Sequence, residues 1–454
     1  MKSNPTLYDS VLEFDPDQPM SEYTFSVRLA KENFWTYDFT RRAIIEYKRF
    51  MYLAAISDAM VSPSKIVDAV WHQHLTFTHS YSDLCKLLGK NIQHVPSTRS
   101  RFDAERFQAA KGYTKKLYKE EFGEAPKDIW DFDTMYDSLN LPKAKFKIRT
   151  VIITGLMIAA VLLIPAYFLL RPIYTDLGSG MFFAIYISSI VLVFVVLAII
   201  DRQLMRSIVN SFDRNSFIFS LDVSELVFLK KQKSEFVVHL RTNKMIANGK
   251  LDVDKDGKIK TTGNALPVSA EEHIILKEFW DSPGDYGSRL KYFGSQPAFT
   301  NANNVMMAFG KFFIKSKAFG NLFYLNFGVI MLMILPGAAR LMTGLVREKP
   351  VGFLVALLLG LAFASFVFLS WLSYVLIRKE VLSHYVRSST TGVRDNAEWD
   401  YFYTGAPVAT FAPVITSYYA TSSSSGSGSG SDLGSESSCG SDGGSSCGGC
   451  GGGD

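Results

Sequence analysis

Four stretches of the chain are almost free of charged side chains, and they set its overall pattern. They cover residues 150–170, 181–200, 322–342 and 351–377. Each is long enough to cross a hydrocarbon core of about 30 Å as a helix. None shows the polar stripe that a helix on the surface of a soluble protein keeps. The pattern therefore predicts two transmembrane hairpins, at residues 150–200 and 321–377.

Basic side chains flank both predicted hairpins on one side. They precede the first and third spans and follow the second and fourth, at Lys143, Lys145, Lys147, Arg149, Arg202, Arg206, Arg214, Lys311, Lys315, Lys317, Arg378 and Lys379. Since cytoplasmic flanks carry the excess of Lys and Arg, we expect both termini and the middle segment in the cytoplasm. The expected location is the plasma (inner) membrane, with the lipid bilayer as a partner and anionic lipid head groups near the basic flanks.

Before the first span, helical periodicity predicts an all-α domain over residues 1–142. Apolar positions recur at helical spacing in segments 25–34, 38–57, 65–79, 81–88 and 101–122. Ser62 and Pro63 have the residue types that favour a helix start, and Gly89 suits a helix end. The first 20 residues are rich in Pro and Asp, so we expect them to be loosely ordered.

The segment between the hairpins, residues 201–320, is predicted to form a small α+β domain. Helical patterns cover segments 221–229, 233–248 and 269–280, and Asp256-Gly257 is a strong signal for a β-hairpin turn. Two helices followed by a hairpin resemble a winged-helix-like order. The basic surplus leaves three interpretations open: a solvated face, contact with anionic lipid, or nucleic-acid binding, of which the last is the least favoured.

The amino-acid composition changes twice near the end of the chain. Residues 378–420 form a juxtamembrane segment with no predicted element, and residues 421–454 contain little besides Gly, Ser, Asp and Cys. Such a composition cannot bury a core, so the tail is predicted to be disordered. Its Cys439, Cys447 and Cys450 could bind soft metal ions loosely, carry a lipid, or have no role beyond the low-complexity composition. The predicted fold class is therefore mainly α.

The one cluster of chemically capable residues lies in the segment 65–79. On a helix, Val67, Val70, Trp71 and His74 share the buried face, whereas Asp68, His72 and His79 share another. His72 and His74 lie roughly 200° apart around the helix, so they cannot hold one ion together.

The second face offers ligands for a divalent metal ion such as zinc. Imidazoles and a carboxylate gathered at about 2 Å from one ion are what such a site needs. The predicted ligands are Asp68, His72, His79 and His94, with Cys85 as a further candidate. In the competing interpretation His74 is a core histidine bonded to a carbonyl, Asp68 only orients His72, and Cys85 is a small buried residue. A nucleophilic pair of Cys85 and a histidine is a third alternative.

Two features of the spans bear on function. Residues 150–170, 181–200, 322–339 and 351–377 contain no Asp, Glu, Lys or His, which argues against ion-coupled transport. The fourth span has small residues at every fourth position, which allow another helix to approach closely. We expect this ridge of Gly352, Ala356, Gly360 and Ala364 to pack within the chain, with a homo-oligomer as the alternative.

These residues carry a resemblance to a known family. The Trp-His-x-His segment, with the residues that follow it, resembles the glycine-rich domain-containing protein-like family over residues 35–125. The layout of the remainder is similar to bacterial multi-pass membrane proteins of unknown function with a Gly/Ser/Cys-rich tail. The resemblance implies a family signature of Asp68, Trp71, His72, His74, Tyr81, Cys85 and His94.

The preferred hypothesis is a scaffold or interaction protein at the cytoplasmic face of a membrane. The sequence holds no complete catalytic constellation, so no catalytic residue is assigned and an enzyme is not the first choice. The alternative is a metal-binding enzyme or sensor that uses Asp68, His72, His79 and His94.

Overall fold

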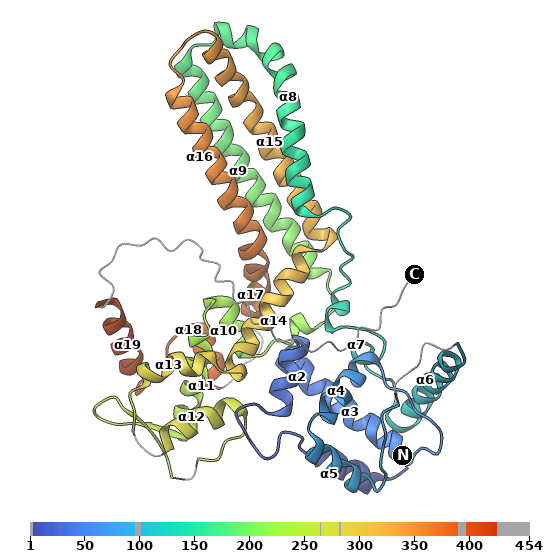
Figure 1. Cartoon of the computed structure of the whole chain (residues 1–454). Coiled ribbons are helices and arrows are strands. Elements are labelled where there is room, and N and C mark those ends of the chain that lie inside the picture. Colours follow the sequence, from blue (N-terminus) through green and yellow to red (C-terminus); the bar gives the residue numbers. More distant parts are fainter. Residues whose placement is uncertain (1–2, 96–100, 264, 281–282, 389–395, 425–454) are drawn as a thin grey trace.

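A computed structural model describes the whole chain except residues 1–2, 96–100, 264, 281–282, 389–395 and 425–454. It is mainly α, as predicted, with a long helical bundle rising from a body of shorter helices (Figure 1). The last helix, α19 (Ala412–Ser424), enters the predicted disordered tail by a few residues. The rest of that tail lies outside the described residues.

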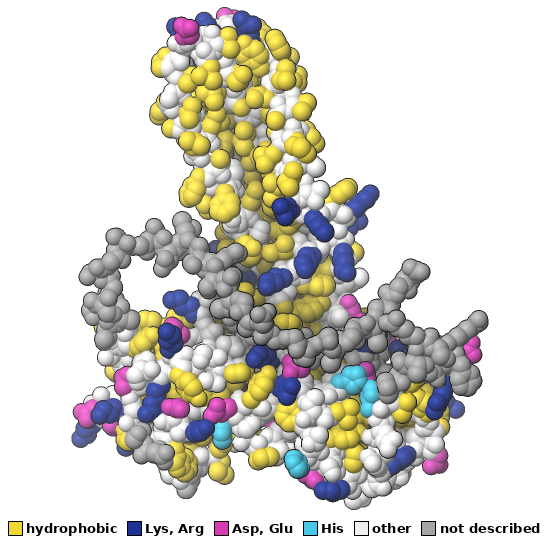
Figure 2. All heavy atoms as spheres, viewed as in Figure 1, with side chains coloured by type: hydrophobic (Ala, Val, Ile, Leu, Met, Phe, Trp, Pro, Cys, Tyr) yellow, Lys and Arg dark blue, Asp and Glu magenta, His cyan; other side chains and the backbone are white. Residues whose placement is uncertain are grey.

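Among the described residues, four helices are long and apolar enough to cross a membrane, which confirms the predicted spans as long apolar helices. They are α8 (Ile148–Asp176), α9 (Ser179–Asn210), α15 (Lys317–Val346) and the continuous stretch Gly352–Arg387. That stretch consists of α16 (Gly352–Trp371), the π-helical turn η3 (Leu372–Leu376) and most of α17 (Ile377–Ser388). Figure 2 shows hydrophobic side chains over most of the bundle and Lys and Arg side chains where it joins the body. An apolar surface of this extent needs a lipid cover, so the chain is suited to be an integral membrane protein.

Helix α15 passes without a break through Pro336 and Gly337, which interrupt its apolar pattern. The Tyr186 hydroxyl donates to the carbonyl of Met333 at 2.7 Å, and the Tyr174 hydroxyl donates to that of Pro336 at 3.0 Å. A Cβ added at Gly337 would stand 2.7 Å from Leu358 Cδ2. Hydroxyl groups of α8 and α9 thus bond backbone carbonyls next to the proline, and the glycine is needed for the close approach of Tyr186 and Leu358.

The small-residue ridge of α16 is not the packing surface that we expected. Gly352, Ala356, Gly360 and Ala364 are all exposed, and a Cβ added at Gly352 or Gly360 would meet nothing within 4 Å. The prediction of packing within the chain is wrong, because this side of α16 faces outward.

A buried polar pair lies at the end of the second predicted span. Asn326 Nδ2 donates to Asp201 Oδ1 at 2.7 Å, and both residues are fully buried. Asp201 follows residue 200 directly and belongs to α9, so the helix that contains the second span does carry a buried acidic side chain just beyond it.

The N-terminal region contains more helix than its periodicity predicted. Its elements are α1 (Pro5–Glu13), α2 (Phe25–Asn33), α3 (Tyr37–Ile56), α4 (Lys65–Leu75), α5 (Thr78–Leu88), α6 (Arg101–Phe122), α7 (Lys127–Trp130) and the 3₁₀ turn η1 (Met135–Leu139). The expected looseness of residues 1–20 is wrong, since Tyr8 and Val11 of α1 are buried. The predicted helix start at Ser62 and Pro63 is wrong, because Ser64 caps α4, which begins at Lys65. The helix expected over residues 65–79 is correct as far as Leu75 and wrong beyond it, since the chain divides at Thr76.

The middle region contains the predicted hairpin. Strands β1 (Leu251–Val253) and β2 (Ile259–Thr261) are antiparallel, with Val253 opposite Ile259. The helices around them are α10 (Val223–Lys231), α11 (Glu235–Ala247), α12 (Ala270–Trp280), α13 (Tyr286–Ser295) and α14 (Pro297–Ile314). The juxtamembrane segment, for which no element was predicted, forms α17 (Ile377–Ser388), α18 (Ala397–Thr404) and the start of α19.

The N-terminal and middle regions share one continuous hydrophobic core. The ring of Tyr136 stacks on that of Phe312 with centroids 4.9 Å apart. The backbone N–H of Tyr37 donates to Glu225 Oε1 at 2.8 Å. Glu225 is buried, which raises its pKa to about 8. The two regions therefore dock as one body.

The close approach at Gly337 can be tested by substitution. We expect Gly337→Ala to destabilise the bundle by about 1–3 kcal/mol, because the new methyl group overpacks the contact with Tyr186 and Leu358. Gly328→Ala on the same helix is the matched control, since its Cβ would meet nothing within 4 Å. Thermal unfolding in detergent measures the difference, and equal stabilities would contradict the assigned packing.

Candidate metal site

The phase of α4 determines which of its side chains can reach a ligand. Ser64 Oγ caps the helix by accepting from the backbone N–H of Val67 at 3.2 Å. The predicted apolar face is buried, with Val67, Val70, Trp71 and His74 between 0% and 6% exposed. Asp68 and His72, one turn apart, are consequently left on the open side of the helix.

A loop brings His94 to this open side. Gly89 ends α5 with a positive φ of 65°, and residues 91–95 return without regular structure. Trp71 Nε1 donates to the Tyr81 hydroxyl at 3.1 Å, and that hydroxyl donates to the carbonyl of Ile92. The Trp71 ring also meets the His94 ring edge to face at 4.7 Å. Two aromatic residues of the signature thus hold the loop that carries His94.

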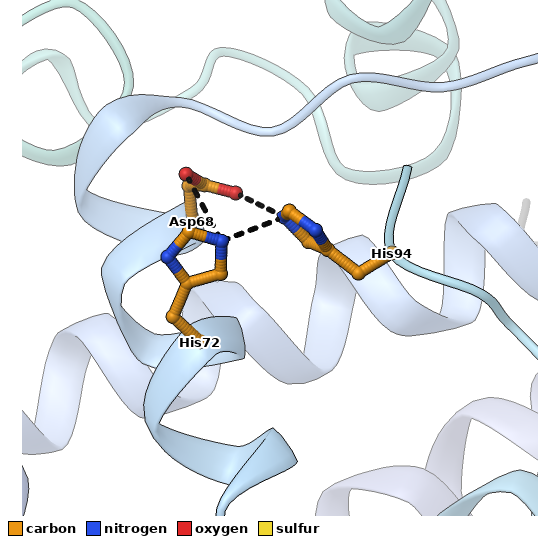
Figure 3. Close-up of side chains that lie close together, drawn as sticks. All are labelled: Asp68, His72 and His94. Atoms are coloured by element: carbon orange, nitrogen blue, oxygen red, sulfur yellow. Dashed lines mark hydrogen bonds and ion pairs between the residues drawn. The ribbon is translucent and has the colours of Figure 1, made fainter. Parts of the chain in front are cut away.

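Asp68, His72 and His94 form a compact cluster (Figure 3). His94 Nε2 lies 3.0 Å from Asp68 Oδ1 and 2.9 Å from His72 Nε2. His72 Nε2 lies 4.0 Å from Asp68 Oδ2. The three side chains are 37%, 56% and 18% exposed, in chain order, so the cluster is open to solvent.

These separations fit one divalent ion. Ligands at about 2.0–2.1 Å from a tetrahedral zinc ion stand roughly 3.3 Å apart. The observed distances of 2.9 and 3.0 Å are slightly shorter than that value, and the 4.0 Å distance, which runs to the second carboxylate oxygen of Asp68, is longer. Small shifts of the side chains would therefore place one ion among the three. Two imidazoles and one carboxylate supply three ligands, which leaves at least one coordination position open.

His79 lies apart from this cluster. The division at Thr76 places it on α5, where it is exposed and close to Asp83. The expected shared face of Asp68, His72 and His79 required an unbroken helix, so the assignment of His79 as a ligand is withdrawn.

Cys85 is a half-buried free thiol. It hydrogen bonds with Tyr81, whose pKa is raised to about 12 by burial. The thiol therefore faces a phenol, and this geometry gives no support to a nucleophilic pair with an imidazole.

His74 is a core residue. Its Nδ1 lies 2.9 Å from the Tyr47 hydroxyl and its Nε2 lies 2.9 Å from Ser80 Oγ. Burial lowers its pKa to about 4, and Lys48 adds to the effect. The predicted core role is correct, but its partners are hydroxyl groups rather than a carbonyl.

A cleft of about 590 Å³ opens beside the cluster, with Asp68 and His94 in its wall. Arg106 and Lys111 of α6 also line it, and sequence analysis did not identify either residue. They lie on a helix that is remote from α4 in the chain, so no local pattern connects them to the site.

In comparisons with known proteins, no family model, curated protein or solved structure matches the chain. Its fold and site define a mainly α protein with four candidate membrane helices and a His-His-Asp cluster on its globular body. The resemblance to the glycine-rich domain-containing protein-like family stays a prediction.

The buried state of His74 gives a pH prediction. Because its folded pKa of about 4 lies below the unfolded value of 6.5, only the unfolded chain takes up a proton between those values. The stability of the folded state is therefore lost as pH falls from 6.5 to 4, by roughly 3 kcal/mol from this group. Thermal unfolding of His74→Gln should show a smaller loss over this range.

The control is His79→Gln, which removes an exposed histidine of the neighbouring helix. It should follow the wild-type pH profile. A His74→Gln profile that also followed it would contradict the role of His74 in acid sensitivity.

Proposed function

We propose that the chain is a membrane-anchored protein that binds a divalent metal ion on Asp68, His72 and His94. One observation carries this proposal: the three ligand atoms, from α4 and from a loop about twenty residues later, converge within 4.8 Å. Their supporting contacts, from Trp71 and Tyr81, hold the loop rather than bond the ligand atoms. The side chains are therefore gathered and positioned by contacts other than the hydrogen bonds that their metal-facing atoms make with one another.

The ligand set favours zinc or ferrous iron. Two histidines and one carboxylate occur in catalytic zinc sites and in non-haem iron sites, which both keep open positions. A structural zinc site uses four protein ligands. Three ligands that are open to solvent support an enzyme or a sensor, so we prefer this function to the scaffold suggested by the sequence.

A second candidate, self-association as a scaffold, is favoured by the exposed ridge on α16. Small residues at every fourth position let two membrane helices approach closely. In this proposal the ridge packs against a second copy of the chain. The basic flanks support an orientation in which the body lies on the cytoplasmic side of the plasma (inner) membrane and faces anionic lipid head groups. The order of helices and hairpin at residues 223–280 supports a winged-helix-like unit, without favouring nucleic acid.

Metal content tests the first proposal. We expect full-length protein, purified in detergent without chelators and then loaded, to hold about one equivalent of zinc or iron. Asp68→Asn and His94→Asn should each weaken metal affinity by a factor of about ten or more, because each removes a ligand. Elemental analysis after dialysis against a competing chelator measures this.

His79→Asn is the matched control, since His79 is an exposed histidine outside the cluster. It should hold metal as the wild type does. Equal affinity in wild type, Asp68→Asn and His94→Asn would refute the site.

Self-association is tested by Gly360→Leu, which places a bulky side chain in the centre of the ridge. We expect the cross-linked dimer in membranes to fall several-fold, while Gly328→Leu on α15 is not expected to lower it. A wild-type protein that stays monomeric in membranes would refute this second candidate.

A further inference from the structure

We propose that the cleft beside the metal site binds a small organic anion, whose phosphate or carboxylate oxygen takes an open position on the metal. The inference rests on the proposed metal site and names the class of ligand that this site would accept. It is carried by the charge, the shape and the lining of the cleft.

The lining of the cleft is strongly basic. Lys65, Lys90, Arg106 and Lys111 line it. Among the described residues of the lining, Asp68 is the one carboxylate, and a bound metal would neutralise it. A cleft of one charge sign concentrates ligands of the opposite sign. The cleft therefore selects for anions.

The four basic residues have different roles. Lys90 Nζ donates to the carbonyls of Ala54 and Ser57 at 2.9 and 2.7 Å, so it closes the wall of the cleft. Lys65 pairs with Asp133 on the surface. Arg106 and Lys111 line the cleft from α6, whereas the metal ligands come from α4 and from the loop at His94. We assign the anion to these two basic residues.

The remaining lining is partly apolar. Met60, Val61, Trp71, Ile92 and Phe107 contribute to it. A volume of about 590 Å³ falls in the range of roughly 300–1,000 Å³ that small-molecule sites occupy. An inorganic anion would leave most of this surface unused, so the ligand should join its anionic group to an apolar body.

The position of the cluster beside the cleft would let one bound anion contact the metal. Asp68 and His94 line the cleft, whereas His72 does not. A metal ion between the three would stand at the mouth of the cleft, with the cleft on one side of it. An anion in the cleft could then give one oxygen to the metal and another to Arg106, whose guanidinium suits two-oxygen contacts.

Cobalt(II) provides the test, because its visible spectrum changes when an anion replaces bound water. Full-length protein in a neutral detergent is loaded with cobalt(II) and titrated with inorganic phosphate, phenyl phosphate and acetate, with chloride as the ionic-strength control. We expect saturable spectral changes, with phenyl phosphate binding at least about five-fold more tightly than phosphate. Dihexanoyl phosphatidic acid distinguishes a lipid source: tighter binding than phenyl phosphate would assign the anionic group to a lipid.

Two variants complete the test. Arg106→Gln combined with Lys111→Gln should weaken phenyl phosphate binding about tenfold while cobalt affinity stays unchanged. The matched control is Lys116→Gln, which removes a largely exposed lysine of the same helix and should change neither.

The outcomes separate the two proposals. Failure to bind cobalt would overturn the metal site and this inference with it. Cobalt binding without any response to phosphate, phenyl phosphate, acetate or phosphatidic acid would overturn the inference alone. An anion response that the double variant leaves unchanged would also overturn it, since the cleft would then have no part in binding.

Discussion

The burial of one face of α4 is the constraint on which the candidate site depends. His74 takes two hydroxyl partners inside the core, and Val67 and Val70 are fully buried beside it. Once this face is fixed, helical geometry leaves Asp68 and His72 no direction but outward. Trp71 contacts both the core and the candidate site, because its ring packs on Phe50 in the core and on His94 at the site. Core packing and ligand geometry are thus set by the same contacts.

Sequence could predict this part because helical periodicity is a local property. The separation of His72 from His74 followed from it. His94 was among the predicted ligands, but it lies on a segment without regular structure, so its approach to Asp68 did not follow from periodicity. His79 could not be placed in the same way. Thr76 N–H bonds back to the carbonyl of Gln73, and its hydroxyl bonds the same carbonyl at 2.7 Å. That closing turn ends α4 early and carries His79 away from the ligand face, and the apolar pattern gives no sign of it.

The features that sequence could not predict depend on contacts between distant segments. Arg106 and Lys111 reach the cleft only because α6 packs against α3 and the segment before α4. The Tyr118 hydroxyl donates to Glu46 Oε2 of α3 at 2.8 Å, and the backbone N–H of Ser62 donates to Thr114 Oγ1 at 2.8 Å. Small residues on α16 indicate where a helix could approach, yet tight contacts between bundle helices occur elsewhere, for example at Gly155 and Gly337. A pattern of residue sizes shows which surfaces are able to pack closely. Which of them meets a neighbour is decided by the tertiary arrangement.

The body that carries the site is joined to the bundle without a flexible tether. The chain entering α8 forms a bridge at Lys143 with Ser316, at the junction of α14 and α15. Lys317 N–H donates to the carbonyl of Pro142 at 2.7 Å, and Ala144 N–H donates to that of Lys315 at 2.9 Å. Together with the core shared by the N-terminal and middle regions, these bonds fix the orientation of α4 relative to the bundle. In a membrane, the cluster would therefore keep a constant height and direction relative to the bilayer, which a flexible linker could not provide.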